Sequence, residues 1–170
     1  MKKLLKHTSA AERLAMVLEE FRSSEISAYG SKAGISAFHL AQAMSGRLNA
    51  TVPYLRLAAA MDYDPTEGQW PFDQPKPIGD FDFVMLAMGL RLRRALNDHT
   101  EGQAAKDSAI GLGHVQRLER GDSLCIGSIL RACSYIQIHV FGYIRQPEKI
   151  GKYRRSYTSH ARTQKDDWDG

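Results

Sequence analysis

The sequence predicts an all-α protein built from two similar small helical units. Apolar side chains recur at helical spacing, as in the stripe from Leu14 to Phe21. Two segments, one in each half of the chain, show the same order of small, apolar and polar positions without a gap, and a proline-rich acidic segment separates them. A pattern that returns in register after a fixed interval indicates two copies of one unit.

The second copy contains a pair of short predicted helices between Glu101 and Gly121. The first runs from Glu101 to Ser108 behind Thr100, whose hydroxyl is suited to an N-cap, with Gln103 placed to complete a capping box. The second runs from Leu112 to Arg120 and ends at Gly121, where a residue without Cβ accommodates a left-handed conformation. A tight turn joins the two helices into a hairpin.

The side chains of this hairpin divide into an inner and an outer face. Ala105 is the small residue at which the helices cross, and the residues expected to point inward are Ile110, Val115 and Leu118. The outer face of the second helix carries Leu112, His114, Gln116 and Arg117. Because this face is mostly polar and basic, it is not expected to pack in the core and is available to bind a partner.

The first copy repeats this arrangement at one constant offset along the chain, which we call the repeat interval. Gly30 takes the crossing position of Ala105, Leu40 that of Val115, and Gly46 that of Gly121. The same interval also pairs the preceding and following helices of the two copies, which are expected to include Ala11 to Arg22 and Phe83 to Asn97. The outer face of the latter carries Arg91, Arg93 and Arg94.

The hairpin, its ending VQRLERG and the helix ILRACSYI that follows resemble the helix-turn-helix of the phage-repressor, Cro-like (XRE) family. The resemblance implies two small five-helix, lambda-repressor-like domains in tandem. It also implies a sequence-specific regulator of transcription that binds double-stranded DNA, with the second helix of each hairpin in the major groove. The sequence departs from the family where the first hairpin helix often begins with Gln, since Ile26 and Glu101 stand there.

This resemblance assigns candidate DNA contacts to both copies and to the C-terminal tail. Gln42 is suited to a bidentate pair with adenine and Arg117 to one with guanine, while Phe38 or Leu112 can pack on a thymine methyl. For the two histidines, base reading and a phosphate-facing position both stay open. The complete set is Ser36, Ala37, Phe38, His39, Gln42, Thr100, Gln103, Leu112, His114, Gln116, Arg117, Arg154 and Arg155.

The expected domains span residues 8–64 and 81–146. Residues 65–80 form an acidic, proline-rich linker, in which Trp70 and Phe72 are candidates to pin the segment to a domain. Residues 147–170 form a basic tail. That tail either follows a phosphate backbone or ends as a solvated, disordered terminus.

The composition limits which partners, cofactors and cellular locations are expected. The net charge of +4 and the pI near 9.1 favour a polyanionic partner only weakly. Cys125 and Cys133 are expected to be core thiols in a reducing cytoplasm, and no metal site or other cofactor is indicated. The apolar run near Lys2 is too short for a signal peptide, and no later run predicts a membrane span.

No pattern of an enzyme stands out. The sequence has no glycine-rich phosphate loop, paired carboxylates or activated nucleophile, so we expect a protein that is not an enzyme. The alternative to a DNA-binding regulator is a protein-interaction module of the antitoxin or anti-activator type, in which one or both hairpins do not read DNA. Further partners open to either hypothesis are a second copy of the chain, in a homodimer, or another regulatory protein.

Overall fold

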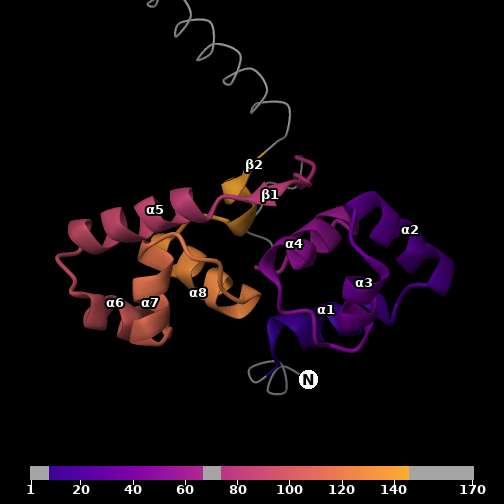
Figure 1. The fold of residues 1–170 in the computed structure, drawn as a ribbon, viewed down its shortest axis with the longest axis horizontal. Helices are drawn as coiled ribbons and strands as arrows, with labels where there is room; N and C mark the ends of the chain where they lie inside the picture. Colours follow the sequence, from indigo (N-terminus) through magenta and orange to yellow (C-terminus); the bar gives the residue numbers. More distant parts are fainter. Residues whose placement is uncertain (1–7, 67–73, 146–170) are drawn as a thin grey trace, which may run out of the picture.

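The structure is a computed structural model that describes residues 8–66 and 74–145 (Figure 1). Within these residues the chain forms eight α-helices, one short 3-10 helix and a single pair of two-residue strands. The all-α fold class is therefore confirmed, but each half has four α-helices among these residues and not the expected five. None of the described helices combines the length and the apolar character needed to cross a bilayer.

The first half contains four α-helices. They are α1 (Ala10–Leu18), α2 (Ser23–Ala33), α3 (Ala37–Met44) and α4 (Thr51–Ala60). The prediction that the first helix continues to Arg22 was wrong, because the backbone N–H of Arg22 is already the partner of the Glu25 carboxylate, 2.8 Å away, at the start of α2. The N-terminus of α1 is held by a capping box between Ser9 and Glu12.

The second half has the same four helices with small additions at its ends. In order they are β1 (Asp80–Phe81), α5 (Phe83–Leu96), α6 (Glu101–Ser108), α7 (Leu112–Glu119), α8 (Ile126–Ile136), the 3-10 helix η2 (Val140–Tyr143) and β2 (Ile144–Arg145). The predicted bounds of α6 are confirmed, and α7 ends one residue before the predicted Arg120. The strands β1 and β2 pair antiparallel, which the sequence did not indicate.

Only half of the predicted capping box at α6 forms. Thr100 caps the helix by accepting the N–H of Gln103 at 3.2 Å. The Gln103 side chain does not reach back to the cap, because its amide instead donates to Asp107 one turn later, at 2.9 Å. An i to i+4 pair on the surface of the helix replaces the second half of the box.

The backbone of the two halves turns at equivalent positions. Most of the described residues with a positive φ form pairs separated by the repeat interval, namely Gly34 with Ala109, Gly46 with Gly121, and Asp62 with Gln137. Helices α3 and α7 also begin and end at equivalent positions, with eight residues each. The repeat seen in the sequence is thus present in local backbone geometry.

The halves meet through contacts between equivalent residues. Ala50 and Cys125, just before α4 and α8, form an antiparallel bridge. Beside it the N–H of Ile126 donates to the carbonyl of Asn49 at 3.0 Å, and the Thr51 hydroxyl donates to the carbonyl of Leu124 at 2.6 Å. Pairs in which a residue contacts its own counterpart are typical of a two-fold axis.

A second contact of this kind lies beyond the C-terminal ends of α4 and α8. His139 and Asp64, which are also equivalent positions of the repeat, approach to 3.0 Å between Nε2 and the carboxylate. Burial would raise the pKa of Asp64, but hydrogen bonds from Thr66 and the neighbouring His139 hold that pKa below its ordinary value. Both ends of the α4 and α8 pair are therefore tied across the halves.

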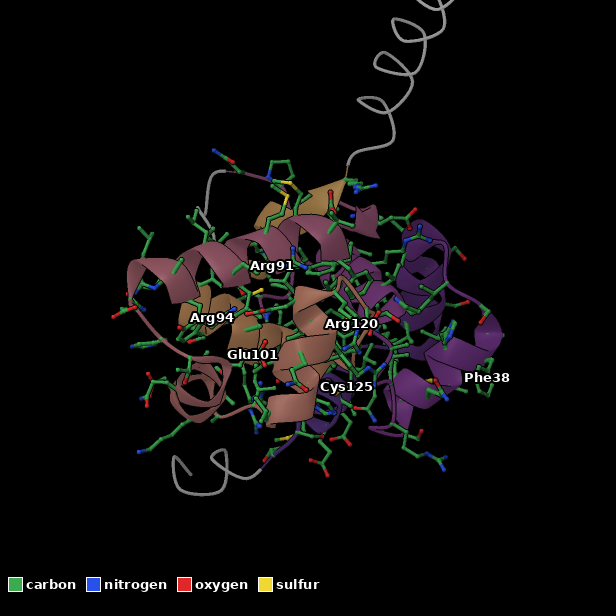
Figure 2. All side chains as sticks on the ribbon, turned by 60° about the vertical axis from the view of Figure 1, so that its left-hand side comes forward. Phe38, Arg91, Arg94, Glu101, Arg120 and Cys125 are labelled. Carbon is green, nitrogen blue, oxygen red and sulfur yellow. The ribbon has the colours of Figure 1, made fainter. Side chains whose placement is uncertain are left out.

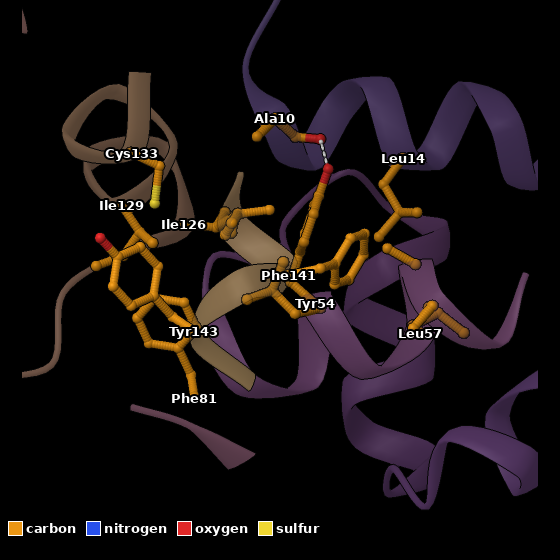
Figure 3. Packing of buried hydrophobic residues seen from close by; sticks show 14 of the residues in the cluster. Ala10, Leu14, Tyr54, Leu57, Phe81, Ile126, Ile129, Cys133, Phe141 and Tyr143 are labelled. Atoms are coloured by element: carbon orange, nitrogen blue, oxygen red, sulfur yellow. Dashed lines mark hydrogen bonds between the residues drawn. The ribbon is translucent and has the colours of Figure 1, made fainter. Parts of the chain in front are cut away.

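The buried side chains of both halves form one continuous hydrophobic cluster (Figure 3). Tyr54 of α4 is fully buried and donates its hydroxyl hydrogen bond to the carbonyl of Ala10 at 3.2 Å. Phe141 of η2 reaches the same cluster, and Phe81 of β1 packs beside Tyr143. Apolar burial of this kind supplies most of the stabilisation of a small helical protein.

The described part of the predicted linker is anchored where it enters the second half. Arg56 of α4 donates to the carbonyl of Gly79 at 3.2 Å and forms an ion pair with Asp80 at 2.6 Å. A Cβ on Gly79 would collide with the carbonyl oxygen of Arg145, so only glycine allows this close approach of the chains. Trp70, Phe72 and the basic tail lie outside the described residues.

Candidate nucleic-acid interface

The two hairpins hold their second helices in the same way. In the first, a Cβ on Gly30 of α2 would lie 3.0 Å from a methyl carbon of Leu40 on α3, a tight contact that favours a small residue at the crossing. The turns match as well, since Ile35 donates to the carbonyl of Gly30 at 3.2 Å and Ile110 to that of Ala105 at 3.0 Å. The inner-face predictions are confirmed by burial of Ala43, Ala105, Ile110, Val115 and Leu118.

The N-terminal end of α3 presents the first set of predicted contacts. Ser36, Ala37 and Phe38 are exposed, and Phe38 projects from α3 with 66% of its surface accessible (Figure 2). Ser36 caps α3 by accepting the N–H of His39 at 3.3 Å, and its hydroxyl also lies 3.1 Å from Nδ1 of the same histidine. The helix start therefore orients the His39 ring.

Gln42 lies one turn farther along α3 and is half-buried. Its carbonyl accepts the N–H of Arg47 at 2.8 Å and the Ser45 hydroxyl at 3.1 Å, so the backbone at this position is fixed by the end of the helix. A side chain on a fixed backbone loses less conformational freedom when it binds a partner.

The predicted contacts of α7 are exposed but are already engaged within the chain. The Gln116 amide donates to Glu101 of α6 at 2.8 Å, and Nδ1 of His114 lies 3.2 Å from the Ser128 hydroxyl of α8. Arg117 donates to the carbonyl of Ser123 at 3.3 Å. Exposed contacts of this strength are readily exchanged, so they orient these side chains without removing them from solvent.

Acidic groups surround α7. Asp122 lies 3.7 Å from Arg117 and 3.1 Å from Arg120, and Glu101 lies at the other end of the hairpin. Leu112 is exposed at the helix start behind Gly111, which supplies no side-chain cap. Compared with α3, this helix presents more charge and is less firmly held at its N-terminus.

The expected outer-face arginines of α5 do not all face solvent. Glu119 at the end of α7 is buried, and Arg94 forms two hydrogen bonds to its carboxylate at 2.7 and 3.1 Å. Arg91 donates to the backbone carbonyl of Glu119, and both arginines project from α5 toward α7 (Figure 2). A buried carboxylate requires such partners, so the outer-face prediction was wrong for Arg94 and for the half-buried Arg93.

A surface hollow joins α7 to the contact between the halves. Beside His114 and Arg117 it is lined by Phe83 and by two segments before and at the start of α4 and α8, residues 49–53 and 123–125. Sequence reasoning missed these two segments, because neither carries a recognised motif. The signal that identifies them is the contact of Ala50 with Cys125, its equivalent in the repeat, which marks where the copies meet.

Cys125 belongs to this hollow and is not the core thiol that the sequence suggested. It is exposed, because it occupies the N-cap position of α8 at the contact between the halves, whereas Cys133 is buried. Partial burial would raise the pKa of Cys125, but hydrogen bonds from Ser128 and from backbone N–H groups at the helix start lower that pKa below its ordinary value.

Two of the candidate residues, Arg154 and Arg155, lie outside the described residues; Thr100 and Gln103 are exposed at the start of α6. Within residues 8–66 and 74–145, no cluster of His, Cys, Asp and Glu is arranged to hold a metal ion. Comparisons of the chain with protein-family models, with curated proteins and with solved structures find no match.

Proposed function

We propose that the protein is a sequence-specific, double-stranded DNA-binding regulator of transcription that places α3 and α7 in the major groove. The observation that carries this proposal is the presence of two equivalent hairpins in one chain, each with polar side chains on its second helix that solvent reaches, half-buried in α3 and exposed in α7. We assign the hairpins to two XRE-like domains, residues 8–64 and 81–146, joined by residues 65–80. The major groove of B-DNA is wide enough to admit an α-helix.

The contacts between the halves support a particular arrangement of the DNA site. Ala50 with Cys125 and Asp64 with His139 are the contacts of a two-fold relation, so α3 and α7 would read half-sites in inverted order. The side chains at equivalent positions differ, with Gln42 opposite Arg117 and Ala37 opposite Leu112. The two half-sites would therefore differ in sequence.

The test of DNA reading is selection of binding sites from random duplex DNA, followed by affinity measurements. Gln42→Ala and Arg117→Ala should each cost about 1–3 kcal/mol of binding, concentrated at one base position in one half-site. Lys76→Ala is the matched control, because this basic residue binds Asp62 outside both hairpins. A loss spread evenly over all sequences would identify a phosphate contact instead.

Salt dependence separates DNA binding from other activities of the same scaffold. Affinity for the selected duplex should fall steeply between low and physiological salt, because basic side chains displace condensed counterions. Removal of residues 147–170 should lower the slope if the basic tail contacts phosphate. Absence of any salt-dependent duplex binding by the full chain would contradict the proposal.

A second candidate function is supported by the chemistry around α7. Glu101 accepts a hydrogen bond from Gln116, and Asp122 forms an ion pair with Arg117. Carboxylates that lie beside a phosphate backbone repel it. These features favour a protein partner for the second hairpin, as in an antitoxin or anti-activator. In that case selection would recover a single half-site read by α3, and Arg117→Ala would leave DNA affinity unchanged.

A further inference from the structure

Helix α5 presents an apolar stripe along its whole outer side. Val84, Met85, Met88, Leu92 and Leu96 are 57, 51, 56, 61 and 72% exposed, whereas Leu86 and Leu90 are fully buried on the opposite side. These five account for half of the ten large hydrophobic side chains that are exposed in the described part of the chain. Patches of this kind mark surfaces for a partner.

The spacing of the stripe is that of a helix-packing seam. Met85, Met88, Leu92 and Ala95 follow intervals of three, four and three residues, and Ala95 is also exposed. Alternating intervals of three and four place side chains on one line along a helix, as in coiled coils and helical bundles. The stripe is therefore shaped to receive another helix.

The counterpart of the stripe in the first half is covered. The positions of Met85 and Met88 are taken there by Ala10, which is buried, and by Arg13. Val17 and Phe21 stand where the second half has Leu92 and Leu96, and both pack against the core. Helix α1 also touches α8 across the contact between the halves. The open stripe is thus specific to α5 and is not a general property of the repeated unit.

We propose that the stripe is the interface with a second copy of this chain, formed by two α5 helices packed antiparallel. With a two-fold axis crossing the helix at position 90, Val84 faces Leu96 of the second copy, Met85 faces Ala95, and Met88 faces Leu92. Each contact is apolar on both sides, as an isologous interface requires.

Charge and area both support this occupant. Arg91 is the charged residue on the exposed side of α5 nearest the axis, and its guanidinium is turned toward α7 by its bond to the Glu119 carbonyl. Five side chains that are each more than half exposed offer on the order of 500 Å² per copy, so two copies bury roughly the 1,000 Å² that a specific interface requires. Because this area is at the lower limit for a specific interface, we expect a weak dimer whose formation depends on protein concentration.

The experiment is sedimentation of the full chain without DNA, from about 1 µM to about 200 µM, the range over which an interface of this size should assemble. We expect a monomer–dimer equilibrium that Leu92→Glu abolishes while leaving the helical content unchanged. Met16→Glu is the matched control, because Met16 is similarly exposed on α1 but lies outside the stripe. It should leave the equilibrium intact.

Cross-linking tests the orientation. In a Cys125→Ser background, the double variant Val84→Cys/Leu96→Cys should form disulfide-linked dimers on mild oxidation, whereas Leu92→Cys alone should not. Efficient linking through Leu92→Cys would indicate a parallel pair and overturn the antiparallel arrangement. A chain that stays monomeric at the highest concentration would overturn the self-association and leave the stripe to a different partner or to another segment of this chain. Because no DNA is present, either outcome is independent of the proposed DNA binding.

Discussion

The first hairpin, α2 with α3, and the second, α6 with α7, have the same backbone frame but different chemistry at their ends. The first turns at Gly34 and caps α3 with Ser36, while the second turns at Ala109 and begins α7 behind Gly111. The residue best suited to a left-handed turn and the residue best suited to an N-cap thus both occur in the first hairpin. The helix crossing and the buried contacts, which the two hairpins share, determine the backbone conformation. The residues at the turn and the N-cap change the stability of that conformation.

The halves differ more strongly in the contacts that other elements make with the C-terminal end of α3 or α7. The second half fixes the end of α7 with the buried Glu119 and the arginines of α5. In the first half the position of Glu119 is Met44, which is exposed, and that of Arg94 is Glu19. One repeat therefore uses an ion pair where the other uses none, so the ion pair is not required by the fold.

The largest expected effect is in the reactivity of the two cysteines, which the second half carries where the first half has Ala50 and Ala58. Burial raises the pKa of Cys133 to about 12, whereas the pKa of Cys125 lies below its ordinary value. At pH 8 the native protein should therefore react with iodoacetamide at Cys125 more than about a hundredfold faster than at Cys133, since the thiolate is the nucleophile. Mass spectrometry of the modified peptides gives both rates, and similar rates would show that the environments are alike.

The next effect concerns the ion pair of the second half. Arg94→Met should lower the free energy of unfolding by about 2 kcal/mol, because it removes the donor of the two hydrogen bonds that hold the buried carboxylate of Glu119. The partial exposure of Arg94 keeps the loss below that of a fully buried pair. Glu19→Met, at the equivalent exposed position of the first half, should change stability by less than about 0.5 kcal/mol. Urea denaturation measures both, and equal losses would mean that the ion pair adds nothing.

Exchange of the turn residues should shift stability in opposite directions. Gly34→Ala should cost about 1 kcal/mol, because the backbone there has a φ of 62°. Ala109→Gly should raise stability by about 0.5 kcal/mol, since Ala109 has a φ of 54° and is relieved of the same strain. Thermal unfolding of the two variants tests whether both turns require the same left-handed backbone conformation. A loss of stability in Ala109→Gly would show that the Cβ of Ala109 stabilises the fold by more than the left-handed conformation destabilises it.

The smallest effects are expected at the N-caps of α3 and α7. Ser36→Ala should cost about 0.5–1 kcal/mol, because it removes the acceptor for the N–H of His39. Gly111→Ser should gain only a few tenths of a kcal/mol, since glycine is already a tolerated N-cap. Both are measured by unfolding without DNA, which separates capping from any role of Ser36 in binding. A gain at Gly111 larger than the loss at Ser36 would contradict the shared geometry.

Local features of the fold were predictable from the sequence, and contacts between distant segments were not. Thr100 and Gly121 marked the ends of the second hairpin, because capping and left-handed turns depend on the residue itself. The pairing of β1 with β2 and the burial of Glu119 beside Arg94 depend on segments brought together by tertiary packing. Periodicity places a residue on a helix face but does not say what covers that face.

The same limit applies to the candidate site. The inner and outer faces of α7 followed from helical spacing, and the burial of Val115 and Leu118 confirms its inner face. In α3 the division is less clear, because Leu40 and Gln42, expected on opposite faces, are both half-buried. Spacing gave no indication that Gln116 and Arg117 already have partners, because Glu101 and Ser123 reach them from other elements. Binding by these two side chains therefore requires exchange of existing contacts.

The contacts of Ala50 with Cys125 and of Asp64 with His139 join the halves within one chain. Their pairing therefore does not depend on protein concentration, because each half is always present at the high effective concentration set by covalent connection. In a symmetric dimer of identical chains, every substitution in the DNA-facing helix occurs in both subunits. Here a substitution in α3 leaves α7 unaltered, so each helix is free to diverge under its own selection while the contact between them is kept.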